Sequence, residues 1–192
     1  MNLDVDQLAA GTGASLQRAA LWIDPMRAAM GIFEITELAR IAAYLAQVGH
    51  ESGRLGDRLP GGRIVEIWGP TPAQAGYEGR KDLGNTQPGD GKRFLGRGPI
   101  QITGRANYAR VRDRLRKFLG EMVPDFEASP ELLENPRWGA YASALFWYDH
   151  GLNALADTGD FMTITRRING GTNGYDDRLA LWERGKAALG VA

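Results

Sequence analysis

The chain has 192 residues, and its 23 basic and 23 acidic side chains cancel, so that the formal net charge at pH 7 is +0. This balance gives no general attraction to nucleic acid, and the absence of cysteine excludes disulfides, thiolate nucleophiles and cysteine zinc sites. The acidic N-terminal stretch MNLDVDQLAAGTGASLQ predicts neither a signal peptide nor a membrane span. We therefore expect a single domain over residues 1–192 that starts in the cytoplasm.

The first part of the chain is predicted to be helical. Ser15 can cap one helix, and Asp24 followed by Pro25 is typical of the start of a second helix. Thr36 is predicted to cap a third helix, whose apolar residues recur at helical spacing: Leu38, Ile41, Ala42, Leu45 and Val48. This spacing indicates a core helix.

Glu51 lies where this apolar stripe ends. Gly49 and Gly53 are stop signals, so the carboxylate falls in the last turn, beside the negative end of the helix dipole. That position disfavours ionisation, and an acid that keeps its proton can donate it. Glu51 is therefore a candidate general acid, although a solvated side chain at a frayed helix end would explain the same placement.

One short β-rich run follows, bounded by glycine and proline. In RIVEIW, the side chains of Ile64, Glu66 and Trp68 share one face. Residues 77–104 are dense in Gly, Pro, Asn and Asp and show no sustained period. A loop of this length in a compact domain is usually functional.

Helical periodicity returns over residues 107–119. An apolar stripe is formed by Tyr108, Val111, Leu115 and Phe118. The opposite side is predicted to be an exposed basic face, formed by Arg110, Arg112, Arg114, Arg116 and Lys117. This face is either merely solvated or attracts the protein to an anionic cell wall, and in both cases its loss should change stability little.

The remaining residues are predicted to form helices that begin at Ser129 and Pro130, span 137–148, span 161–168, and run from a cap at Asp176 to Ala188. The segment 137–148 is strongly apolar and is expected to lie in the core. The expected class is therefore mainly α, with one small β insertion between Gly53 and Trp68.

The residue inventory limits the chemistry. His50 and Glu51 lack the second histidine of an H-E-x-x-H helix, and no G-x-S-x-G elbow is present, so we expect neither a metal site nor a serine nucleophile. Paired carboxylates remain. Inverting glycoside hydrolysis needs a protonated acid and an ionised carboxylate about 6.5 to 9.5 Å apart, with water between them. Glu51 suits the first role and Glu66 the second.

Three stretches carry a resemblance to a known family: HESG, YEGRKDLGNTQPGDGKRFLGRGPIQITGRANY and INGGTNGYDDRLALWERG. Together they resemble the family 19 chitinase-like endolysins of bacteriophages and prophages, over most of the chain from Ala39 onward. The resemblance implies a lysozyme-like, two-lobed helical domain with a small β-hairpin beside the cleft. It also implies one catalytic domain, without a separate cell-wall-binding domain and without a cofactor.

The resemblance also assigns site residues. It makes Glu51 the general acid and Thr103 the residue that positions the attacking water. Its substrate-binding positions are Gln101, Asn107, Asn169 and Arg178. Gln101 and Asn107 could equally satisfy backbone groups in a buried loop, which is the commonest fate of interior amides.

The second acid is left open, because plant chitinases place it ahead of G-R-G and endolysins place it on a hairpin soon after H-E-S. Glu66 is the first choice because it lies in the middle of the β run, Glu78 is the runner-up, and Asp57 is third. An ion pair with Arg80 or a capped turn would explain Glu78 without catalysis.

The expected function is that of an endolysin, an N-acetylmuramidase-type glycosidase that cleaves the β-1,4 glycan of peptidoglycan for host lysis. Its partners are expected to be glycan strands, not nucleic acid or a membrane, and it is expected to be a monomer. It would stay in the host cytoplasm until a holin-type pore releases it to the wall. Two alternatives are a chitinase, although chitinases of this family usually carry disulfides or binding domains, and a catalytically silent glycan-binding module.

Overall fold

The computed structural model describes residues 3–59 and 62–191. The α-helices along the chain are α1 (Val5–Thr12), α2 (Leu16–Ile32), α3 (Leu38–Glu51), α4 (Pro72–Ala75), α5 (Asp90–Arg93), α6 (Arg105–Leu119), α7 (Pro136–Asp149), α8 (Leu152–Asp157), α9 (Phe161–Asn169) and α10 (Tyr175–Leu189). Short 3₁₀ helices are η2 (Lys81–Leu83), η3 (Gly120–Met122) and η4 (Pro130–Glu134). No helix within the described ranges is long and apolar enough to cross a membrane.

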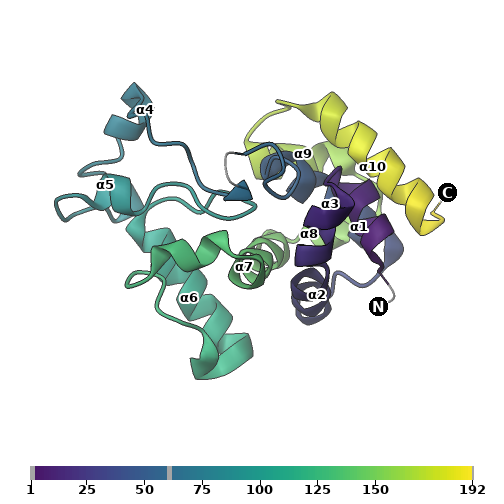
Figure 1. The fold of residues 1–192 in the computed structure, drawn as a ribbon, viewed down its shortest axis with the longest axis horizontal. Helices are drawn as coiled ribbons and strands as arrows, with labels where there is room; N and C mark the ends of the chain where they lie inside the picture. The colour runs from purple at the N-terminus through teal and green to yellow at the C-terminus, as the bar shows by residue number, and fades with distance from the viewer. Residues whose placement is uncertain (1–2, 60–61, 192) are drawn as a thin grey trace.

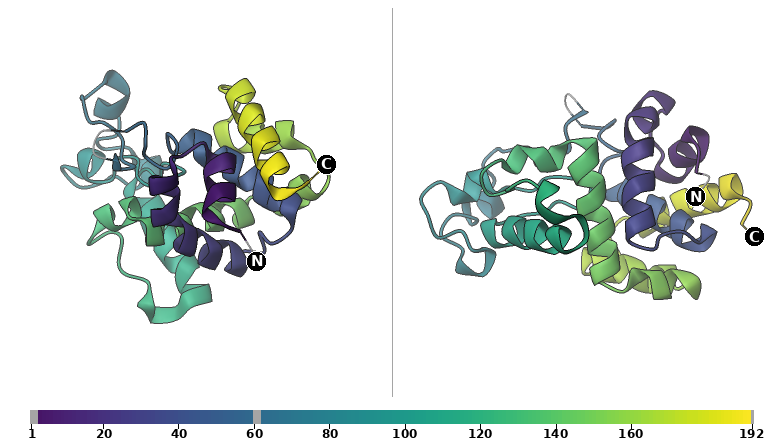
Figure 2. Two further views of the ribbon diagram at one scale, coloured as in Figure 1. Left: turned by 45° about the vertical axis from the view of Figure 1, so that its right-hand side comes forward. Right: turned by 90° about the horizontal axis from the view of Figure 1, so that it is seen from below.

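The helices form two groups, with α7 between them. In Figure 1, α4, α5 and α6 lie on one side, whereas α1, α3, α9 and α10 lie on the other. The view from below in Figure 2 agrees, since the green α7 again separates the teal segments from the purple and yellow ones. α7 packs against α2 on one side and α6 on the other, and α3 packs against α10. The prediction of a mainly helical, two-lobed domain is confirmed.

The middle of α3 is buried on all sides, from Ile41 to Gly49. Glu37, not Thr36, occupies the cap position. Gly49 lies inside the helix instead of ending it. A Cβ at this residue would lie 2.3 Å from the carbonyl oxygen of Thr12 in α1. The glycine predicted as a stop signal is therefore required for the close approach of α1.

α2 is one helix, whereas two were predicted. Ser15 caps it as expected, its hydroxyl accepting the backbone N–H of Arg18 at 3.2 Å. Pro25 lies inside the helix, where proline usually costs about 3 kcal/mol or more. Trp22 and Met26 on either side of it are fully buried, and this packing holds the helix together across the proline.

The predicted β-hairpin is absent from the residues that the structure describes. Val65 forms an isolated antiparallel bridge with Arg97, and Arg97 forms another with Ile102. The extended run therefore pairs with the G-R-G stretch, far along the chain. Residues 53–56 all have positive φ and form a turn, so they cannot supply the second strand of a local hairpin.

The basic side chains of α6 are mostly paired. Arg112 donates to Asp125 and to Glu127, each at 2.8 Å, and its side chain is only 17% exposed. Arg114 forms a two-point ion pair with Asp149. The predicted exposed face is therefore wrong for Arg112, and removing this arginine would leave Asp125 without a cation, whereas Glu127 would keep Arg105 at 3.5 Å.

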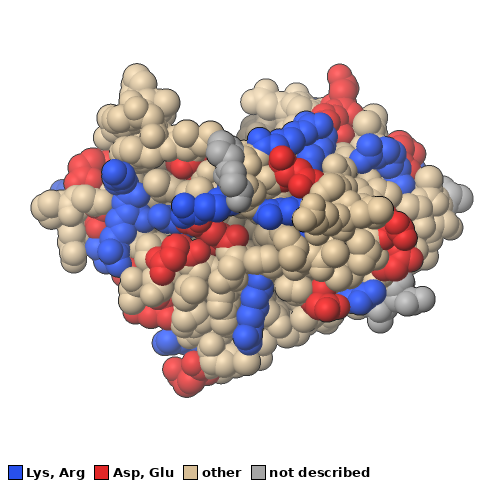
Figure 3. All heavy atoms as spheres, viewed as in Figure 1, with Lys and Arg blue, Asp and Glu red and all other residues tan. Residues whose placement is uncertain are grey.

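Two basic side chains of α6, Arg110 and Lys117, have no ion-pair or hydrogen-bond partner among residues 3–59 and 62–191. Arg116 is bound to the carbonyl of Val123 at 3.3 Å. Figure 3 shows acidic and basic side chains interspersed over the face that it draws. A long-range attraction to an anionic wall would thus rest on fewer free charges of α6 than the sequence indicated.

Candidate active site

Glu51 is the last residue of α3, and its partner comes from α10. Nη2 of Arg178 donates to Oε1 of Glu51 at 2.5 Å, and Nη1 donates to Oε1 of Gln47 at 2.6 Å. Arg178 is 1% exposed, whereas the Glu51 side chain is 23% exposed. The two guanidinium bonds fix the orientation of the carboxylate.

Gln47 was missed by the sequence reasoning, although its position four residues before Glu51 puts both on one helix face. Its amide nitrogen donates to the hydroxyl of Thr165 at 2.8 Å. Gln47 therefore ties the guanidinium of Arg178 to α9 as well as to α3.

A second ion-paired group lies next to Glu51. Asp177 accepts a hydrogen bond from Nδ1 of His50 at 2.6 Å and also pairs with Arg54. Burial raises the pKa of Asp177, but the hydrogen bonds from His50 and Arg54 outweigh it and hold that pKa below its ordinary value. Asp177, in the first turn of α10, thus binds residues that precede and follow Glu51 in the sequence.

Glu66 is half-buried and held by three donors. Its Oε1 accepts from the amide of Gln74 at 3.0 Å and from the hydroxyl of Tyr77 at 3.4 Å, and its Oε2 accepts from the backbone N–H of Gly96 at 3.1 Å. Burial and the charge of Glu66 raise the pKa of Tyr77, which keeps the phenol a donor. Gln74 and Tyr77 were not predicted, because no local sequence signal links them to Glu66.

Gly96 is the point where Glu66 meets the GRGPIQIT stretch. A Cβ on Gly96 would lie 3.4 Å from Oε2 of Glu66, 3.3 Å from Oγ1 of Thr103 and 2.6 Å from Oε1 of Gln101. Three polar side chains therefore converge on a residue that has none of its own. A carboxylate beside a hydroxyl can hold and deprotonate a water molecule.

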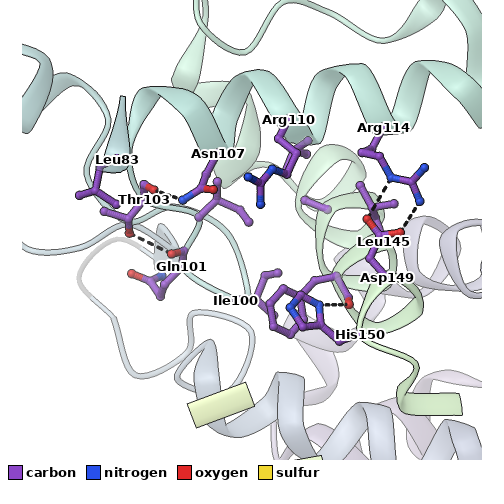
Figure 4. A pocket seen from close by; sticks show the side chains of 14 residues that line it. Leu83, Ile100, Gln101, Thr103, Asn107, Arg110, Arg114, Leu145, Asp149 and His150 are labelled. Atoms are coloured by element: carbon purple, nitrogen blue, oxygen red, sulfur yellow. Dashed lines mark hydrogen bonds and ion pairs between the residues drawn. The ribbon is translucent and has the colours of Figure 1, made fainter. Parts of the chain in front are cut away.

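A pocket of about 350 Å³ between α6 and α7 is lined at one end by Gln101, Thr103 and Asn107 (Figure 4). The amide nitrogen of Gln101 donates to the carbonyl of Gly98 at 3.0 Å, and that of Asn107 donates to the carbonyl of Thr103 at 2.7 Å. These bonds fulfil the alternative role of satisfying backbone groups. Both amide oxygens, however, accept no hydrogen bond from the described residues and stay available to a ligand.

Gln101 also has an unusual backbone conformation. Its φ is +52°, in the left-handed region that residues other than glycine seldom adopt. Strain of this kind, of order 1–3 kcal/mol, tends to occur at functional sites. The Gln101 side chain of this turn reaches Gly96, where its Oε1 would lie 2.6 Å from an added Cβ.

The two other candidates for the second acid have structural partners. Glu78 accepts the backbone N–H groups of Gly89 and Gly91, at 2.7 and 2.8 Å, as a capped turn would. Asp57 accepts the backbone N–H of Ser15 at 2.5 Å and ties its turn to the start of α2. Each carboxylate thus has a role in holding a loop.

Asn169, the last predicted site residue, ends α9. Its Nδ2 is buried and has no hydrogen-bond partner in the described part of the chain. The structure thus brings Glu51 and Arg178 into contact, and Glu66 together with Gln101 and Thr103. No such contact joins Asn169 to either group.

Asp90 anchors the loop that carries this site to α6. It is 1% exposed and accepts from Nε and Nη2 of Arg105 at 3.0 and 2.5 Å, and from the backbone N–H of Gln87 at 3.0 Å. The bond from Arg105 outweighs burial and lowers the pKa of Asp90. The unfolded chain therefore binds the proton first, at its ordinary pKa of about 3.9.

This linkage predicts how acid destabilises the protein. The contribution of Asp90 to stability is fully present above pH about 4 and is lost as the pH falls through the lower folded-state pKa. Asp90→Asn should lower the free energy of unfolding near neutral pH by about 1–3 kcal/mol, since donors lose a charged partner. Urea unfolding of both proteins between pH 7 and 3 measures this. The difference in the free energy of unfolding between wild type and Asp90→Asn should become smaller toward pH 3. A difference independent of pH would contradict the linkage.

Two solved structures share this fold. Chitinase C from Streptomyces griseus HUT6037 aligns with a TM-score of 0.68 at 21% identity, covering 99% of this chain and 77% of that one. A structure described as a bacterial family 19 chitinase gives a TM-score of 0.67 at 21% identity, covering 99% of this chain and 96% of that one. The class is therefore the lysozyme-like, mainly helical fold of family 19 chitinases.

Sequence relatives give the family. A Haemophilus influenzae protein described as containing a glycosyl hydrolase family 19 domain is 33% identical over 162 residues, covering 73% of this chain and 76% of that protein. An endochitinase of Arabidopsis thaliana is 32% identical over 134 residues, and the chain spans 39% of its length. No protein-family model matches the chain. The chain belongs to glycosyl hydrolase family 19.

Proposed function

We propose that this family 19 protein hydrolyses the β-1,4 glycosidic bonds of bacterial peptidoglycan with inversion of configuration. The observation that carries the proposal is the convergence of Glu66, Gln101 and Thr103 around Gly96, in a chain that also holds the carboxylate of Glu51 in a fixed orientation. A carboxylate with a neighbouring hydroxyl and a second, separately held carboxylate are the groups that inversion requires.

The proposed roles follow from these contacts. Glu51, oriented by Arg178, donates a proton to the leaving glycosidic oxygen. Glu66 removes a proton from a water molecule that Thr103 orients, and the water oxygen bonds to the anomeric carbon from the face opposite the leaving group. The proton gained by Glu66 replaces the one lost by Glu51, so the site is restored after exchange with solvent. Substrate binding is assigned to Gln101, Asn107 and Asn169, whereas Arg178, predicted as a fourth binding residue, is buried and acts through Glu51.

The biological role proposed is that of an endolysin. Support comes from the HESG, GRGPIQITGRANY and INGGTNG strings, which resemble phage and prophage endolysins. In this role the protein acts as a monomer, accumulates in the host cytoplasm and reaches the cell wall through a holin-type pore.

A chitinase is the second candidate, because the Arabidopsis relative is described as an endochitinase and both solved structures as chitinases. A silent glycan-binding module has less support, since Glu66 is present and bound by three donors beside Thr103.

One digestion separates these functions. Purified peptidoglycan and chitin oligosaccharides are incubated with the protein, and the new reducing ends are identified by mass spectrometry. Reducing N-acetylmuramic acid ends would support the muramidase, whereas cleavage of chitin alone would replace it with the chitinase. Intact substrates in both reactions would favour the binding module. Proton NMR identifies which anomer is released first, and the identity of this anomer tests inversion.

Thr103→Ala should reduce kcat more than it changes KM, because a hydroxyl that orients water acts mainly in the transition state. Thr158→Ala is a matched control, since the Thr158 hydroxyl also donates to a backbone carbonyl but is exposed on another helix end. Steady-state kinetics on soluble glycan chains measure both. A rise in KM with unchanged kcat would contradict the proposed role of Thr103.

A further inference from the structure

The pocket between α6 and α7 continues beyond the proposed catalytic residues. From Thr103 and Asn107 it runs along α6 to Arg110 and Arg114 (Figure 4). Its wall there is largely apolar, formed by Val111, Ala142, Leu145 and Phe146. A polar substituent that enters this part must therefore find its partners among a few side chains.

Among the described residues that line this part of the pocket, one cation lacks a partner. Arg114 is paired with Asp149 at two points. Nδ1 of His150 donates to the carbonyl of Phe146 at 2.8 Å. Arg110 has no hydrogen-bond or ion-pair partner in the described ranges, and its side chain points into the pocket in Figure 4. A single free guanidinium thus lies against an apolar wall.

A guanidinium in such a setting binds carboxylates well. It offers paired donors that match the two oxygens of a carboxylate, and Arg110, although exposed, has these donors free on the pocket side. Chitin cannot exploit this, because its sugars carry only neutral amide and hydroxyl groups. In peptidoglycan, alternate sugars carry a lactyl group that ends in a carboxylate or continues into a peptide with carboxylates.

Arg110 is also at a suitable place along the glycan. It follows Asn107 by one turn of α6, which corresponds to about 5 Å along the helix axis. A sugar held at Asn107 beside Thr103 would therefore place its substituent against Arg110.

We propose that the α6–α7 pocket is a subsite for the carboxylate-bearing substituent of the glycan, and that Arg110 selects acid-bearing glycan over neutral glycan. This inference rests on the proposed function, because it concerns the substrate that the same site cleaves. It adds a specificity-determining residue on a helix face that the sequence predicted to be either solvated or attracted to an anionic wall.

The test compares three glycans that share one backbone. The first retains its peptides, the second has its peptides removed and exposes the lactyl carboxylate, and the third has that carboxylate converted to a neutral methylamide. The quantity measured is kcat/KM on each acidic glycan divided by kcat/KM on the neutral one. Wild type should prefer acidic glycan, and Arg110→Gln should lower that ratio by about tenfold or more, as expected for loss of a charge-assisted hydrogen bond.

Lys117→Gln is the matched control. It removes one positive charge from the same helix, at an exposed residue that does not line the pocket. The control should keep the wild-type ratio. Equal ratios in wild type, Arg110→Gln and Lys117→Gln would overturn the proposal. Dependence on Arg110 with the second glycan assigns the lactyl carboxylate, and dependence only with the first assigns a peptide carboxylate.

A binding measurement separates this inference from the proposed function. Calorimetry with Glu51→Gln, alone and combined with Arg110→Gln, gives the dissociation constants of the acidic and neutral glycans without cleavage. If wild type fails to cleave peptidoglycan but binding still prefers acidic glycan through Arg110, the hydrolytic function fails and the subsite stands. If binding shows no such preference, the subsite fails, whether or not cleavage occurs.

Discussion

Glu51→Gln is expected to abolish glycan cleavage while leaving the fold intact. Glutamine has the shape of glutamate and can still accept a hydrogen bond from Arg178, but it has no proton to donate to the leaving oxygen. General acid catalysis typically contributes about 10²- to 10⁴-fold, so a loss of at least this size is expected in kcat. Kinetics on purified peptidoglycan measure the loss, and thermal unfolding checks the fold.

Glu37→Gln provides the control for this substitution. Glu37 lies at the opposite end of α3, is exposed, and makes no side-chain capping bond. The same chemical change on the same helix should therefore leave cleavage at the wild-type rate. If Glu51→Gln cleaved within a few-fold of wild type, Glu51 would not be the acid.

The second large effect is expected at Glu66. Glu66→Gln removes the proposed base, so kcat should fall by about 10²- to 10⁴-fold. Its one oxygen can accept either from Gln74 and Tyr77 or from the backbone N–H of Gly96, so stability should also fall by about 1–3 kcal/mol. Steady-state kinetics and urea unfolding on the same preparations give both quantities.

Glu78→Gln is the informative comparison. Glu78 uses both carboxylate oxygens to accept backbone N–H groups, and glutamine offers only one, so stability should fall by about 1–3 kcal/mol while the folded protein still turns over. The reverse pattern, with turnover lost in Glu78→Gln and kept in Glu66→Gln, would make Glu78 the base.

Local signals predicted much of the helical fold. The apolar spacing of α3 indicated a core helix with Glu51 at its end, and the apolar run of α7 indicated the central helix, because burial at helical spacing is visible within one segment. Pro25 misled the prediction of α2, since the packing that outweighs the proline comes from another helix.

The candidate site shows more clearly what could not be predicted from the sequence. The resemblance supplied Glu51, Thr103 and Arg178 as site residues. The periodicity of the sequence, however, could not show that the Arg178 guanidinium from α10 binds the Glu51 carboxylate. Likewise, the run containing Glu66 looked like half of a local hairpin. The backbone N–H of Glu66 instead donates to the carbonyl of Gly96 at 2.8 Å, and this pairing depends on the whole fold.

The contact between α3 and α10 also bears on when activity can arise during synthesis. Glu51 leaves the ribosome early, but Arg178 follows 127 residues later. Until α10 has been translated and has docked, the proposed acid lacks the side chain that orients it, and Gln47 lacks its guanidinium partner. A nascent or prematurely terminated chain that stops before Tyr175 would therefore carry the proposed acid, base and water-positioning residues and still be inert. In the proposed endolysin role, this order of assembly would delay activity until translation of the helical domain is finished.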